Sequence, residues 1–99
     1  MQGLRLRLEL YTQPGCHLGN DLRALCERLG GEVAIELIEV NIESDPELRV
    51  RFAREVPLLF VDGRKAVRFR TSERELRRIL RWQLLRRRIL RRPPWTGGT

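Results

Sequence analysis

The segment that decides the fold is LRLRLELYTQPGCHLGNDLRALCERLGG, residues 4–31. Leucines alternate with charged residues from Leu4 to Leu10, which is the period of a half-buried strand. The residues Tyr11 to Gly15, which end in a Pro-Gly pair, then predict a loop. Apolar residues recur at helical spacing after it, until Gly30-Gly31 ends the run. Cys16 is therefore expected in the turn that leads from a strand into a helix.

A second strand and a short helix follow this unit. Residues 33–42 are rich in β-branched side chains and predict a strand. The sequence Ser44-Asp45-Pro46-Glu47 is typical of a helix start. We expect Ser44 as the N-cap, Pro46 in the first turn and Glu47 in a capping box. This helix is expected to run to about Arg54.

The last third of the chain predicts a hairpin and a long helix. An apolar run over residues 56–61, opened by Pro57, predicts a strand, and Asp62-Gly63 is a hairpin turn signal. Residues 65–69 then form the return strand. A second capping box begins at Ser72 and opens a helix that Pro93-Pro94 must end.

The element order is therefore β-α-β-α-β-β-α, which predicts an α/β fold. The first βαβ unit is expected to be parallel and right-handed, and the last two strands antiparallel. This gives a four-stranded mixed sheet flanked by helices on both faces. We expect one domain over residues 1–92, including an extended basic C-terminal helix, and a flexible tail over residues 93–99.

The composition fits one small domain in a reducing compartment. The chain has 99 residues, 41% of them hydrophobic, which allows one modest core. Two cysteines do not suggest a disulfide-stapled secreted fold. The N-terminal residues lack the pattern of a signal peptide, and no run approaches the ~20 apolar residues of a membrane span. We therefore expect a cytoplasmic protein without a membrane span.

The net charge of +7 is concentrated at the C-terminal end. Residues 63–99 hold 13 Lys and Arg against 2 Glu, whereas residues 1–62 hold 7 Arg against 11 acidic residues. Such a basic helix either solubilises the protein or binds nucleic acid, an acidic protein or an anionic membrane, and we favour the solubilising interpretation. Its distal apolar residues exceed what a four-stranded sheet needs, which leaves a homodimer through this helix as an alternative.

The quoted motif resembles the active-site segment of short glutaredoxin-like proteins, in which Tyr-Thr ends a strand and Pro-Gly-Cys-His-Leu-Cys opens a helix. Residues 40–48 and 56–63 look like the second strand with its following helix and the third strand of that family. The resemblance covers roughly residues 4–80. It implies a thioredoxin-like fold, and it implies that Pro57 is cis and faces the active-site cysteine.

Two residues depart from the family pattern. Gly19 replaces the second cysteine, so the motif is C-x-x-G, and Gln13 stands where the family often has lysine. The first change removes the internal resolving thiol. The second removes a cation that would bind a carboxylate or acidify the nucleophile. The core-facing Cys26 does not replace the missing thiol, since ten helical residues rise about 15 Å and a disulfide needs Cα atoms within about 7 Å.

Cys16 is the predicted catalytic residue, because a helix N-terminus favours a thiolate. The predicted substrate-binding residues around it are Tyr11, Gln13, His17, Val56 and Pro57, the last two offering a backbone edge to a peptide or a glutathione-like tripeptide, as the resemblance implies. An aromatic residue at a strand end, such as Tyr11, is also often packing. No metal site is expected, since His17 is the only histidine.

Two functions follow from this pattern. The first is a monothiol glutaredoxin-like thiol–disulfide oxidoreductase, which acts through Cys16 on mixed disulfides between a protein and a small thiol. Its partner would be a thiolated or disulfide-containing protein. It would bind no cofactor tightly, with glutathione or another low-molecular-weight thiol as co-substrate. The alternative is a redox-silent thioredoxin-fold module that binds an acidic partner or nucleic acid through the basic helix.

Overall fold

The computed structural model describes residues 5–90, except for the side chain of Leu90. Its centre is β1 (Leu6–Thr12), which lies between β2 (Ile35–Asn41) and β3 (Leu58–Val61) in a sheet of order β2-β1-β3-β4. The strand β4 (Arg64–Arg68) forms the other edge. β1 is parallel to β2 and antiparallel to β3, and β3 and β4 form an antiparallel hairpin. This confirms the predicted mixed sheet and the α/β fold class.

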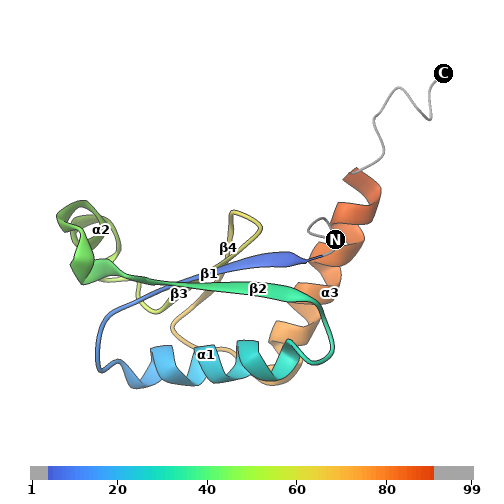
Figure 1. Ribbon diagram of the computed structural model, residues 1–99, viewed down its shortest axis with the longest axis horizontal. Helices are drawn as coiled ribbons and strands as arrows, with labels where there is room; N and C mark the ends of the chain where they lie inside the picture. The colour runs from blue at the N-terminus through green and yellow to red at the C-terminus, as the bar shows by residue number, and fades with distance from the viewer. Residues whose placement is uncertain (1–4, 91–99) are drawn as a thin grey trace.

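Two helices lie along one face of the sheet, and a shorter one packs on the other face at one end only (Figure 1). α1 (His17–Leu29) and α3 (Glu73–Leu90) lie against one face, where their apolar side chains meet Leu6, Leu8 and Leu10 of β1. α2 (Pro46–Phe52) contacts the other face through Phe52, which packs near Leu58. Because side chains alternate along a strand, β1 and β3 contribute to both clusters.

The element ends differ from the sequence-based expectation at several points. Tyr11 and Thr12, expected in a loop, extend β1 by pairing with Val40 and Asn41. β3 is paired only from Leu58 onward, although the apolar run begins at Val56. α2 ends at Phe52 instead of Arg54. The proline pair and the tail lie outside the described residues.

The predicted N-cap of α2 was wrong. Asp45 is the N-cap, and its carboxylate accepts a hydrogen bond from the Glu47 N–H at 2.9 Å. Ser44 instead ends a one-turn 3-10 helix, η2 (Ile42–Ser44), and its hydroxyl donates to the Asn41 carbonyl at 2.6 Å. The Asn41 side chain starts this extra turn by accepting from the Glu43 N–H, which moves the helix start by one residue.

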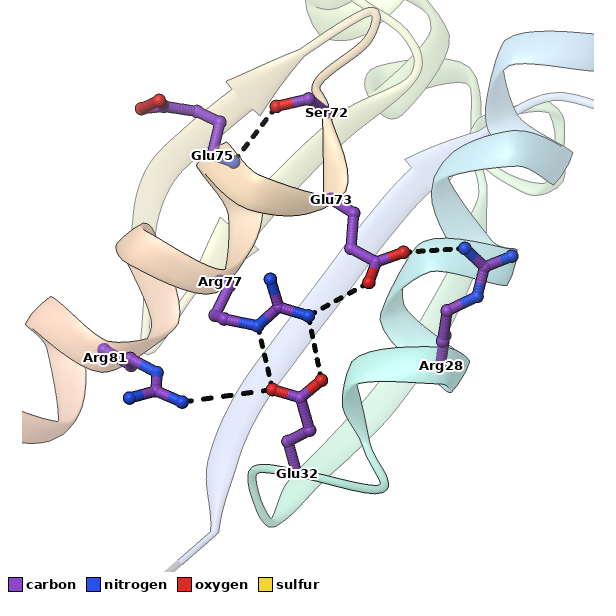
Figure 2. Close-up of polar contacts among 7 residues, drawn as sticks. All are labelled: Arg28, Glu32, Ser72, Glu73, Glu75, Arg77 and Arg81. Carbon is purple, nitrogen blue, oxygen red and sulfur yellow. Dashed lines mark hydrogen bonds and ion pairs between the residues drawn. The ribbon is translucent and has the colours of Figure 1, made fainter.

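Polar contacts fix the first turns of α3 against α1 (Figure 2). The Ser72 hydroxyl accepts from the Glu75 N–H at 3.0 Å, as expected of an N-cap. Glu73 bonds to Arg28 of α1 and to Arg77, and Arg77 makes two bonds to Glu32, which follows α1. The pKa values of the Glu32 and Glu73 carboxyls are held below their ordinary range, chiefly by these hydrogen bonds from arginine.

Asp62 anchors the distal half of α3 to the sheet. It lies in the β3–β4 turn with a positive φ of 50°, and its carboxylate accepts from the Arg7 backbone N–H at 2.8 Å. The same carboxylate accepts from Gln83 at 2.9 Å and from Arg87 at 2.8 and 3.2 Å. One turn residue therefore ties β1 and α3 together at the sheet end where β3 finishes.

Candidate active site around Cys16

Three separate segments meet at one end of the sheet. The loop over residues 13–16 leaves β1 there, and Tyr11 pairs with Leu58, so Pro57 lies beside the end of β1. The chain that leaves β4 reaches the same place, because the Phe69 N–H donates to the Pro57 carbonyl at 2.7 Å. The sheet topology thus brings the Cys16 loop, the Val56–Pro57 pair and residues 69–71 to one end.

Cys16 is the N-cap of α1 and is partly exposed. Its backbone is extended, with φ −81° and ψ 111°, and its Sγ accepts a hydrogen bond from the Gly19 N–H at 3.3 Å. Gly15 has a φ of +75°, a conformation that glycine adopts without strain, and so turns the loop into the helix. The sulfur therefore faces the unpaired N–H groups of a helix N-terminus, which carry positive partial charge.

Gly19 occupies the place of the missing second thiol. It is buried, and a Cβ built on it would lie 3.5 Å from the Cys16 Cβ. This separation is within the range found in disulfides, roughly 3.5–4.5 Å. The same Cβ would overlap the Thr12 hydroxyl. The backbone thus keeps the spacing of a two-cysteine motif, while the Thr12 side chain fills the space that a second side chain would need.

Cys26 lies in an environment opposite to that of Cys16. It is fully buried in the core under α1, as expected from its helical face. Burial, with a smaller contribution from the charge of Glu27, raises the pKa of Cys26 to about 12. Because the thiolate is the reacting form, this thiol is inert at neutral pH.

Thiol labelling is expected to separate the two cysteines. At pH 8 the native protein should react with one equivalent of a water-soluble thiol reagent within minutes, at Cys16, and with a second equivalent only after unfolding. Cys26 is protected both by burial and by its raised pKa. Peptide mapping of the labelled protein checks this, and equal labelling of both thiols in the native state would contradict the assignment.

The predicted substrate-binding residues divide into two groups. The side chains of Gln13 and His17 are exposed beside Cys16, whereas Val56 and Pro57 are buried. The Val56–Pro57 peptide bond is cis, as the resemblance implies. Within the described residues 5–90, neither the Val56 N–H nor its carbonyl has a backbone hydrogen-bond partner. This leaves a donor and an acceptor next to Pro57.

Tyr11 contributes to packing at this end of the sheet. Its ring centroid lies 4.9 Å from that of Phe52 and 5.3 Å from that of Phe60, in tilted and edge-on arrangements. The half-buried ring joins α2 to the sheet on the face opposite α1. The structure thus gives Tyr11 the packing role that the sequence left as an alternative.

Sequence reasoning missed Arg70 and Thr71. They border a hollow of about 280 Å³ together with Leu18, Asp21 and other residues of α1. A second hollow of about 330 Å³ lies along the loop, where Gln13 and Arg23 are among its lining residues. Each hollow therefore has an arginine at its border, although the lysine of the family pattern is absent. The predicted antiparallel hairpin of β3 and β4 could have indicated these two residues, because it brings the chain that follows β4 back beside Pro57.

The described part of the chain shows no group of three or more His, Cys, Asp or Glu side chains that could hold a metal ion. Among the helices described, none combines the length and the apolar character that a membrane crossing needs.

The family model of the glutaredoxin-like domain (DUF836) matches residues 7–91. The chain belongs to this glutaredoxin-like family. The match spans the sheet, all three helices and the Cys16 loop, and so confirms the resemblance seen in the motif. A search of curated proteins gives no match.

Solved structures share the fold of this chain. A structural-genomics target from X. campestris is 26% identical with a TM-score of 0.64, over 74% of this chain and 93% of that one. A protein from Nitrosomonas europaea is 23% identical with a TM-score of 0.66, over 77% and 92%. A mutant thioredoxin from Halobacterium salinarum is 19% identical with a TM-score of 0.56, over 76% and 71%. These similarities establish the thioredoxin-like fold.

Proposed function

We propose that this glutaredoxin-like protein is a monothiol thiol–disulfide oxidoreductase that removes a small thiol from a protein–small-thiol mixed disulfide. The observation that carries this proposal is the position of Cys16. Cys16 is partly exposed, and its sulfur caps a helix N-terminus and accepts a hydrogen bond from the Gly19 N–H, whereas Cys26 is fully buried. Cys16 is thus the accessible nucleophile of the described chain.

The reaction proceeds by two thiol–disulfide exchanges. The Cys16 thiolate attacks the small-thiol sulfur of the mixed disulfide, and the protein thiolate leaves and takes a proton from solvent. The Cys16–small-thiol disulfide that results is then attacked by a second small thiolate. That step forms the symmetric small-thiol disulfide and regenerates the Cys16 thiolate. The net reaction therefore consumes one mixed disulfide and one free small thiol, and it yields the reduced protein thiol and the symmetric small-thiol disulfide.

The absence of a cysteine at position 19 selects this pathway over reduction of protein disulfides. With glycine there, no second sulfur stands near Cys16 to displace a bound protein from an intermolecular disulfide. A small thiol from solution must therefore break the disulfide at Cys16. It reaches that disulfide more easily when Cys16 carries a small thiol than when Cys16 carries a whole protein. A reducing compartment such as the cytoplasm supplies that thiol.

The surrounding residues suit a tripeptide thiol such as glutathione. The free N–H and carbonyl of Val56 can pair with an extended backbone beside the sulfur. Arg70 stands at the border of one flanking hollow and can attract a carboxylate, whereas Arg23 at the other hollow already pairs with Glu39 at 3.4 Å. Gln13 and His17 are exposed at the loop and can add further contacts.

Turnover of a glutathionylated peptide tests this proposal. The wild type, coupled to excess glutathione, is expected to exceed the Cys16→Ser variant by roughly 10³-fold or more, because the nucleophile is lost. Cys26→Ala is the matched control and should stay within about threefold of the wild type, since Cys26 is buried away from the reaction. Equal rates for the wild type and Cys16→Ser would favour the redox-silent binding module instead.

A further inference from the structure

The outward side of α3 carries cations and exposed apolar side chains in one stripe. The opposite side of the helix, with Leu76 and Leu80, is buried in the core. We define the Arg–Trp face by five outward residues that border a shallow hollow of about 710 Å³: Arg74, Arg78, Arg81, Trp82 and Leu85. The distal part of this face lies toward the end of the sheet opposite Pro57, since Asp62 anchors the distal helix at one end of β3 and Pro57 lies at the other.

The apolar part of this face is unusually exposed. Trp82 is 59% exposed and Leu85 is 44% exposed, one turn apart on the helix. Large apolar side chains that stay in water beside one another mark interaction surfaces more often than isolated ones do. Trp82 offers a flat ring that nothing in the described chain stacks upon.

The charge of the face is only partly neutralised. α3 contains seven Arg and two Glu residues. Arg77, at the edge of the hollow, is held by Glu32 and Glu73. By contrast, Arg78 and Arg81 are more than 60% exposed and form only surface pairs, which contribute little and open readily. Arg74 has no ion pair within residues 5–90.

These features distinguish between possible occupants. A second copy of α3 on this face would bring two rows of arginine together, which opposes a dimer there. An anionic membrane takes the broad apolar side of an amphipathic helix, and here that side is already buried against the sheet. A polyanion that also presents flat rings satisfies both the guanidinium groups and Trp82.

We propose that the Arg–Trp face binds single-stranded nucleic acid without sequence preference. Arg74, Arg78 and Arg81 recur about 6 and 4.5 Å apart along the helix axis, which presents a row of cations to a phosphate backbone. Trp82 lies next to this row and stacks on a base, an interaction that tolerates any base. This binding is a second activity, independent of the chemistry at Cys16.

Fluorescence anisotropy of a labelled 15-nucleotide oligouridylate with the full chain tests the proposal. We expect saturable binding that weakens roughly 20-fold between 50 and 200 mM salt, because about three phosphates are contacted. Arg78→Gln/Arg81→Gln should weaken binding at 50 mM salt and flatten the salt slope. Trp82→Ala should weaken it about fivefold or more, the loss of one stacked base. Cys16→Ser should bind as tightly as the wild type.

The matched control is Arg49→Gln/Arg54→Gln on and after α2, which removes the same charge from another exposed site. It is expected to change the affinity less than twofold. The proposal would be overturned by no binding at 20 mM salt, or by an equal loss in the control pair. Equally effective displacement of the oligonucleotide by poly-glutamate would also overturn it and assign the face to acidic proteins. A concentration-dependent dimer that Trp82→Ala dissociates would overturn it in favour of a second copy.

Discussion

The Gly19→Cys variant is expected to gain the ability to reduce protein disulfides. The Cβ position at residue 19 lies 3.5 Å from the Cys16 Cβ, so the two thiols can form a disulfide without backbone movement. Once Cys16 has attacked a substrate disulfide, the introduced thiol can displace the substrate by attacking the Cys16 sulfur. The internal disulfide that results is reduced by dithiothreitol. Because an intramolecular step replaces a bimolecular one, we expect a gain of roughly 10²-fold in dithiothreitol-driven insulin reduction.

The Thr12 side chain determines how fully this gain appears. Its hydroxyl overlaps the new Cβ, so Thr12 must change its rotamer in the single variant. Adding Thr12→Ala removes the overlap and is expected to raise the rate further. Gly19→Ser is the matched control, because it introduces a similar side chain without a thiol and should reduce no insulin above background. A double variant that keeps both thiols free under mild oxidation would contradict the proposed geometry.

The Asp62→Asn variant is expected to lose about 2–3 kcal/mol of stability, because an amide with one acceptor oxygen replaces a largely buried carboxylate whose two oxygens accept hydrogen bonds from three residues. The Asp62 carboxylate, whose side chain is 13% exposed, accepts hydrogen bonds from Arg7, Gln83 and Arg87. Asparagine tolerates the positive φ, so the change removes charge while the turn is kept.

Urea unfolding of this variant measures the stability loss, and hydrogen exchange locates it. Faster exchange is expected from Gln83 onward, because this turn ties distal α3 to the sheet. The matched control is Glu75→Gln, which breaks the exposed pair with Arg78 and should cost less than about 0.5 kcal/mol. An equal loss of unfolding free energy in both variants would contradict the role of Asp62 in holding α3 to the sheet.

The element order was predictable because the local patterns agree with one another. The alternating leucines of β1 and the helical spacing of α1 each specify one structure, and the Asp62-Gly63 turn specifies the hairpin. The ends were less predictable, since they depend on partners distant in sequence. Thr12 belongs to β1 only because Asn41 pairs with it, and Asp45 replaces Ser44 as the N-cap because Asn41 starts its own turn.

The centre of the candidate site was predictable, and its surroundings were not. Cys16 and Pro57 each belong to a recognisable sequence motif, and the predicted fold brings the two motifs together. Arg70 and Thr71 belong to no such motif, and they reach the site only through the return of β4 beside Pro57. The overlap between Thr12 and a side chain at position 19 could not be predicted from the sequence, because it depends on how the end of β1 packs on α1.

The central claim is that Cys16 works alone and carries a small thiol as its intermediate. Intact-protein mass spectrometry after treatment with a glutathionylated peptide, without free thiol, tests it most directly. We expect an adduct of one glutathione per chain, mapped to Cys16 and lost when glutathione is added. An unmodified protein, or an adduct on Cys26, would contradict the monothiol mechanism.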